Sequence, residues 1–324
     1  MATEDNEDRT DCSWAKSEFG LPDRFILFDR LKSILLPGAV RRNFLLLPLA
    51  LFGLNGCVGK LVSNAAETFI EDVSRAAAQH DDLDLIADAS PTFLLLLEGL
   101  LERNPNDQEL LTLAAQGYTS YAILVESQDL PRARRLYHRA KTYGLRALAQ
   151  DDKMGSLIKA PYEEFRHITD ELKDNDIEMI FWAASSWGAW ISANTESMQA
   201  LSELPKVILL MEWIVQQDET FEYGSPHIFL GVYHAALPPM LGGKPDQALF
   251  HFDRALEISQ EQALMAYVLK AQYYARQIFD RELYVSLLER ALEKPANQNP
   301  ELTLQNIAAQ RLARKLLAET EDFF

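Results

Sequence analysis

The pattern of apolar and polar positions predicts helices along most of the chain. Apolar residues recur three and four positions apart, and breaks rich in proline, glycine and asparagine separate the periodic segments. No segment alternates apolar and polar residues with a period of two for long, and β-branched residues are sparse. The sequence therefore predicts an all-α fold. The expected helices span residues 65–88, 90–104, 106–126, 153–175, 175–192, 206–217 and 301–319, with others after residue 131, within 226–259 and around 271–291.

Two of these helices carry local start signals. Ser90 followed by Pro91 suggests an N-cap and a proline in the first turn, where its missing N–H costs nothing. Asn106 with Glu109 three residues later is the spacing of a capping box. We therefore expect helices to begin just after Ser90 and just after Asn106.

The segment 226–259 shows a specific order of small and aromatic residues. Gly231 lies in the first apolar run, and the second run reads Ala248-x3-Phe252-x2-Ala255. A small residue in each helix lets two backbones approach, and an aromatic side chain fills the space between them. This order is typical of a tetratricopeptide repeat, with the longer than usual linker LPPMLGGKPD between its two helices.

The same pattern recurs earlier in the chain, because Gly117 is followed by Ala133-x3-Tyr137-x2-Ala140. Just over three repeats of about 34 residues separate the two copies, so one or two degraded units should lie between them. A fourth unit is expected around Tyr274 and Ala291, which occupy its two helices. The prediction is a right-handed array of about four TPR-like helix-turn-helix units with flanking helices. It covers residues 89–319, after an anchor and leading helix at 57–88 and before a tail at 320–324.

Composition narrows the class of partner. The chain has 324 residues, of which 48% are hydrophobic and 24% are charged, and these are globular values. Its formal net charge of −17 argues against a nucleic-acid partner, since phosphate binding needs a basic surface. The acidic surplus is ordinarily a solvated face, and the alternative is a surface that docks a basic patch on a partner.

A second motif lies before the predicted repeats. Two arginines precede an apolar run of signal-peptide length, too short to cross a membrane, within residues 41–56. The run ends in Leu54-Asn55-Gly56-Cys57, which resembles the lipobox of a bacterial lipoprotein signal, with Asn55 a less usual residue at its place. This resemblance implies acylation of Cys57 and a membrane anchor. The alternative is a buried helix with an incidental cysteine.

The position of this motif bears on the residues before it. A secretory signal should begin close to the true start of a protein, so we expect residues 1–40 to be a non-native or disordered extension, with translation starting at Val40. Val58 follows the cysteine where an aspartate would signal inner-membrane retention. The lipoprotein interpretation therefore favours a periplasmic location at the outer membrane.

Candidate chemistry is sparse. His227 and His234 are seven residues apart and share a helix face, and His251 could approach from the paired helix. No carboxylate or cysteine at ligand spacing supports a metal site there, so packed or solvent-facing histidines are expected. Ser185 and Ser186 lack a neighbouring base. We expect no enzymatic activity, no cofactor and no metal.

A tryptophan cluster is the main candidate for ligand contact. Trp182 and Trp190 are eight residues apart on one helix face, and Trp187 lies to one side. Core packing between neighbouring helix pairs is the favoured interpretation. The alternative is that these aromatic rings line a ligand cavity.

Residues 57–319 resemble the T-component family of tripartite ATP-independent periplasmic (TRAP) transporters. The resemblance rests on the lipoprotein cysteine, EGLL at 98–101, FWAASSWGAWI at 181–191, GGKPDQALFHFDRALEIS at 242–259 and MAYVLKAQYYARQIFDRELYVSLLERAL at 265–292. It implies a helical bundle of four cryptic repeats that forms a homotrimer, an extracytoplasmic solute-binding protein as partner, and a transport role for organic or hydrophobic solutes. The alternative is a TPR scaffold lipoprotein for envelope assembly with no small-molecule ligand.

Overall fold

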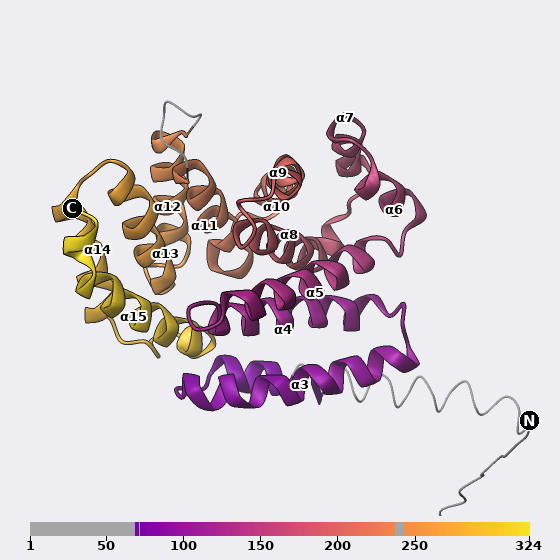
Figure 1. The fold of residues 1–324 in the computed structure, drawn as a ribbon, viewed down its shortest axis with the longest axis horizontal. Coiled ribbons are helices and arrows are strands. Elements are labelled where there is room, and N and C mark those ends of the chain that lie inside the picture. Colours follow the sequence, from indigo (N-terminus) through magenta and orange to yellow (C-terminus); the bar gives the residue numbers. More distant parts are fainter. Residues whose placement is uncertain (1–68, 71, 237–242) are drawn as a thin grey trace, which may run out of the picture. The chain divides into compact units, whose positions relative to one another are not determined.

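The protein is helical throughout the part of the chain that the structure describes. The computed structural model describes residues 69–70, 72–236 and 243–324, and these residues contain no β-strand (Figure 1). They belong to a single compact unit that covers residues 63–324. The predicted all-α fold class is confirmed for these residues.

The helices follow one another with short connections. A first helical segment occupies residues 69–70 and 72–78. The N-terminal half continues with α3 (Leu83–Arg103), α4 (Gln108–Glu126), α5 (Leu130–Leu148), α6 (Asp152–Lys159), α7 (Tyr162–Phe165), α8 (Ile177–Ser192), α9 (Met198–Ser202) and α10 (Leu204–Gln217). The C-terminal half contains α11 (Phe221–Ala235), α12 (Pro245–Ile258), α13 (Leu264–Leu269), the π-helical segment η4 (Lys270–Ala275), α14 (Arg281–Glu293) and α15 (Thr303–Ala318).

Aspartate caps set several helix starts. The carboxylates of Asp82, Asp107, Asp129, Asp151 and Asp280 accept hydrogen bonds from backbone N–H groups in the first turns of α3, α4, α5, α6 and α14. Each carboxylate satisfies donors that have no partner within the helix and lies at the positive end of the helix dipole.

The two start signals expected from the sequence are wrong. Ser90 and Pro91 lie inside α3, where the Ser90 hydroxyl donates to the Ile86 carbonyl at 2.6 Å instead of capping a new helix. The helix therefore continues through the proline. The cap of α4 is Asp107, whose Oδ1 accepts from the Leu110 N–H at 3.1 Å, so the capping box predicted at Asn106 is not formed.

The predicted helix pairs are in contact. Helices α4 and α5, α8 and α10, α11 and α12, and α13–η4 and α14 pack against each other, and α15 packs on α14. Among the expected packing positions, Ala133, Tyr137, Ala140, Ala248, Phe252, Ala255 and Ala291 are buried, Gly231 is buried against the Phe252 ring, and Gly117 and Tyr274 are partly buried.

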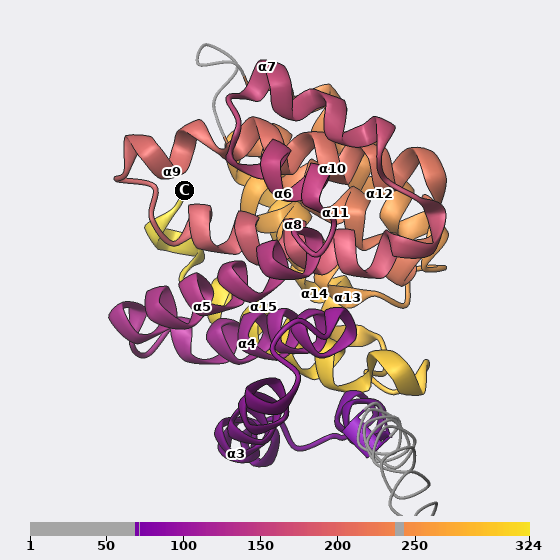
Figure 2. The same ribbon diagram turned by 90° about the vertical axis from the view of Figure 1, so that its right-hand side faces the viewer.

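Successive elements build three layers at the N-terminal end. Helix α3 packs on α4, the pair α4–α5 packs on α8, and α8 packs on α10, as the end view shows (Figure 2). The α5–α8 contact is close because Gly144 has no side chain: a Cβ there would lie 2.8 Å from the Ala183 Cα. Far along the chain, Arg311 of α15 forms an ion pair with Asp84 of α3 at 2.7 Å. Helix α3 is thus held at one end, while one of its faces lies open beside α5.

Candidate functional site

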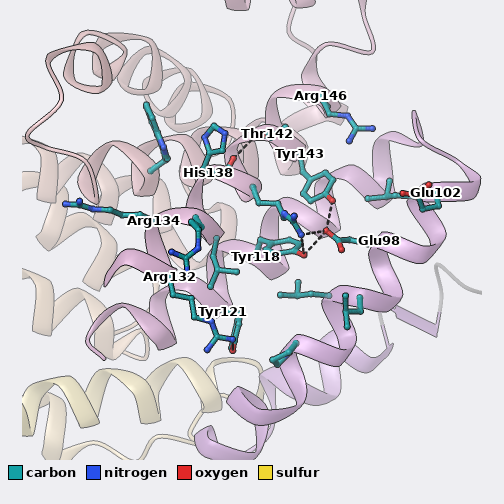
Figure 3. Close-up of a pocket in the computed structure, with 18 of the residues that line it drawn as sticks. Glu98, Glu102, Tyr118, Tyr121, Arg132, Arg134, His138, Thr142, Tyr143 and Arg146 are labelled. Carbon is teal, nitrogen blue, oxygen red and sulfur yellow. Dashed lines mark hydrogen bonds and ion pairs between the residues drawn. The ribbon is translucent and has the colours of Figure 1, made fainter. Parts of the chain in front are cut away.

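A cleft of about 1340 Å³ lies between α3 and α5 (Figure 3). The α3 wall is largely apolar and includes Pro91, Leu94 and Leu95. Tyr118 and Tyr121 of α4 lie between the two walls. The volume exceeds the roughly 300–1,000 Å³ of most small-molecule pockets, so the cleft has room for an extended organic ligand.

The α5 wall is basic. Among the described residues, five arginines line the cleft: Arg132, Arg134, Arg135, Arg139 and Arg146. Positions three, four and seven apart lie on one helix face, so most of these guanidinium groups follow a single strip of α5. The formal net charge of the chain is −17, whereas this strip is positively charged. It makes the cleft attractive to an anion.

A carboxylate from α3 neutralises the middle of the strip. Glu98 Oε1 accepts hydrogen bonds from the Tyr118 hydroxyl at 2.8 Å, from the Tyr143 hydroxyl at 3.0 Å and from Arg139 Nη1 at 2.7 Å. Burial raises the pKa of Tyr118, and burial together with the Glu98 hydrogen bond raises the pKa of Tyr143 to about 12. Both hydroxyls therefore stay protonated and act as donors at neutral pH.

The other arginines differ in their partners. Arg132 Nη2 donates to the Tyr121 hydroxyl at 2.8 Å, a neutral acceptor. Arg134 Nε donates to the Ala193 carbonyl, and its Nη2 lies 2.8 Å from Glu196. Arg146 Nη2 donates to the Pro105 carbonyl at 2.5 Å.

Arg135 has no counter-charge among the residues that the structure describes. Its side chain is exposed, and within the described part of the chain it forms no hydrogen bond or ion pair. The guanidinium is therefore available to a bound anion.

The three tryptophans predicted as a possible ligand cavity have different surroundings. Trp190 lines the end of the cleft, and the Lys141 Nζ lies 3.6 Å from its ring centroid. Trp187 is 2% exposed, and its Nε1 donates to Glu203 Oε2 at 2.5 Å. Trp182 is partly buried against Phe181 in an edge-to-face contact. The structure thus brings Trp190 to the cleft and places Trp187 in the core.

The histidines of α11 and α12 form a second polar cluster. His227 Nδ1 and His251 Nδ1 are 2.8 Å apart, and the ring of His234 stacks on that of His251 with 5.6 Å between centroids. His227 Nε2 lies 3.5 Å from a Glu219 carboxylate that Arg254 also binds. The expected approach of His251 to the other two histidines is therefore present.

This cluster predicts a loss of stability in acid. Burial lowers the pKa of His227, His234 and His251, for His251 to about 4, whereas unfolded histidines titrate near 6.5. The unfolded chain therefore binds more protons between these values. We expect this cluster to lower the free energy of unfolding by about 1–2 kcal/mol as the pH falls from 7.5 to 5, measured by urea denaturation.

A matched pair of variants isolates this effect. His251→Gln should flatten the pH dependence, while His167→Gln, at an exposed position, should keep it. A wild-type curve that the His251 substitution leaves unchanged would contradict the assignment.

No metal site accompanies the histidines in the described parts of residues 69–324, where no group of three or more His, Cys, Asp or Glu side chains is arranged to hold an ion. Among the described helices, none combines the length and apolar character that a membrane crossing requires. The proposed lipidation site Cys57 and the lipobox residues Leu54, Asn55 and Gly56 lie outside the described residues.

The arginine strip is the feature of this candidate site that the sequence analysis did not predict. The sequence does contain a signal for it, because arginines recur at helical spacing within one helix of an acidic chain, at Arg132, Arg135, Arg139 and Arg146. What the sequence did not show is that the apolar wall of α3, with the exposed Leu95, lies across the cleft from them.

Comparison with known proteins places this geometry in a family. The family model for the TRAP transporter T-component matches residues 79–324, which include both walls of the cleft. An uncharacterized protein of Treponema pallidum (strain Nichols) is 23% identical over 270 residues, which are 78% of this chain and 84% of that relative. Because the family model matches well over half of the sequence, the chain belongs to the TRAP transporter T-component family.

Proposed function

We propose that this chain is a lipid-anchored, non-enzymatic accessory subunit of a TRAP transporter that associates with the solute-binding protein and holds an organic ligand in the cleft between α3 and α5. Family membership gives it an accessory role with other TRAP subunits in the cell envelope. The observation that supports ligand holding is the cleft itself. Its apolar α3 wall and basic α5 wall suit an organic molecule that carries negative charge.

The proposal includes the organisation expected from the sequence. The helix pairs α4–α5, α8–α10, α11–α12 and α13–α14 make up a TPR-like array, and three copies of the chain associate as a homotrimer. Acylation at Cys57 anchors the trimer to the periplasmic leaflet of the outer membrane. Contact between neighbouring pairs supports the array, and the sequence motif at Leu54–Cys57 supports the anchor.

Native mass spectrometry of the chain purified with the solute-binding protein of the same transporter tests this function. We expect a complex that contains both proteins, with three copies of this chain and a bound organic mass. A complex with the partner that never carries a small molecule would favour the alternative of a scaffold lipoprotein. Failure of the two proteins to associate under any salt condition would contradict the accessory role.

A further inference from the structure

Two cross-cleft contacts define a common register between α3 and α5. Glu98 contacts Arg139 and Pro105 contacts Arg146, and both pairs are 41 residues apart in the sequence. Pro105 follows the end of α3 at Arg103, so the two contacts show that this end of α3 runs parallel to α5. Pro91 and Arg132 lie seven residues, close to two helical turns, before Glu98 and Arg139, and both line the cleft, where they form a third cross-cleft position.

This third cross-cleft position lacks a carboxylate such as Glu98, which faces Arg139. The acidic residues among the described lining residues are Glu98, at the middle of the arginine strip, and Glu102, one turn further along α3 and away from Pro91. Among the described residues, the Arg135 side chain forms no ion pair, and the Arg132 side chain has only the neutral Tyr121 hydroxyl as a hydrogen-bond partner. Asp129 caps the start of α5 through the Arg132 backbone N–H, and no described carboxylate pairs with either of these two guanidinium groups.

Apolar surface lies beside these two guanidinium groups. Leu95 is 66% exposed although it is a large hydrophobic residue, and it lines the cleft together with Leu136 of α5. Within the part of the chain that the structure describes, this leucine is left largely uncovered. A ligand that buried it would gain about 25 cal/mol for each Å² of apolar surface removed from water.

We propose that a ligand carboxylate completes the third cross-cleft position, bound by Arg132 and Arg135, and that the ligand is a monocarboxylate with an aliphatic chain lying on Leu95 and Leu136. This inference rests on the proposed ligand-holding function and names the substrate class. Guanidinium groups bind carboxylates through short, paired hydrogen bonds, which fix the head group, while the leucines accept any flexible apolar chain.

The charges at the other end of the cleft select for a single acidic group. There, Arg139 is paired with Glu98, and Arg146 lies with Glu102 among the residues that line the same end. These two arginines and two acids balance in charge, and the hydrogen-bond partner of Arg146 is the Pro105 carbonyl. A second carboxylate there would lose hydration without meeting a net positive charge, so the cleft favours a monoanion over a dicarboxylate of the same length.

Isothermal titration calorimetry of the full chain with monomeric dodecanoate tests the head group and the chain separately. Dodecanol keeps the chain and lacks the charge, butanoate keeps the charge and shortens the chain, and dodecanedioate adds a second acid. We expect dodecanoate to bind most tightly. Dodecanol and dodecanedioate should each bind about tenfold more weakly or worse, and butanoate about a hundredfold more weakly.

Substitutions at exposed positions locate the site without disturbing the core. Arg135→Gln should weaken dodecanoate binding about 10- to 100-fold, the effect of losing a charged hydrogen-bond partner. Leu95→Glu places the missing carboxylate on the protein and should abolish binding. Leu96→Glu is the matched control, because Leu96 is 58% exposed on the same helix but does not line the cleft, and it should bind like the wild type.

Three results would overturn the proposal: equal affinities for dodecanol and dodecanoate, equal affinities of the Leu95→Glu and Leu96→Glu proteins, or no binding of dodecanoate by the wild type. If dodecanoate does not bind while the chain still associates with the solute-binding protein and carries another organic mass, only the ligand class is wrong. If partner association and bound mass are absent as well, the proposed function fails with it.

Discussion

Phe252→Ala is expected to lower the free energy of unfolding by about 3–5 kcal/mol, the usual cost of removing a buried phenylalanine ring. Phe252 is fully buried between α11 and α12, and its ring fills the space that Gly231 leaves open: a Cβ on Gly231 would lie 3.1 Å from the ring atoms. The α11 backbone at Gly231 cannot move easily into the space that the ring leaves, so a cavity remains. Urea denaturation followed by circular dichroism measures the loss.

Phe250 provides the matched control on the same helix. Its side chain is 60% exposed and contacts the rings of His227 and His251 edge-on, so Phe250→Ala should change stability by about 0.5 kcal/mol or less. Equal losses for the two variants would show that α12 does not pack on α11 as described.

Trp187→Ala is expected to cost about 3–5 kcal/mol as well, for a different combination of reasons. The indole is 2% exposed, lies edge-to-face with Phe165, and donates to the Glu203 carboxylate that also binds Lys141. Its loss leaves a cavity and removes one donor from a partly buried ion pair. Burial lowers the pKa of Lys141, and the hydrogen bond to Glu203 acts in the opposite direction by stabilising the charged ammonium.

Trp190→Ala separates packing from binding. Trp190 is partly exposed at the end of the cleft, so its loss should cost about 1–2 kcal/mol and weaken ligand binding more than Trp187→Phe does. If the Trp187→Ala protein is as stable as the wild type in the absence of ligand, the core position of Trp187 is contradicted.

The helices themselves were predictable because their apolar positions repeat with the period of a helix. The partners of α12 were predictable too, since the order Gly231, Ala248, Phe252 and Ala255 specifies which residues meet. The start of α3 was not. Ser90 and Pro91 have the composition of a helix start, and only the tertiary setting of α3 keeps the helix continuous through them, with Asp82 as its cap.

The candidate site was harder to predict because it depends on register between helices distant in sequence. Helical spacing alone groups the arginines of α5 on one face. Glu98 contacts Arg139, and Pro91 rather than an acid lies seven residues earlier on α3. Both features depend on how α3 packs on α4. Gly144 is a similar case: its sequence context is an ordinary helix, and its role appears only where α5 meets α8.

Photolabelling with a diazirine analogue of dodecanoate tests most directly the claim that the cleft between α3 and α5 holds the ligand. After irradiation of the full chain and digestion, mass spectrometry identifies the labelled peptides. Labels within residues 91–105 and 132–146 that excess dodecanoate displaces, and that Leu95→Glu but not Leu96→Glu removes, are the predicted result. Displaceable labels confined to other helices, such as α11–α12 or the core face of α8, would contradict the account.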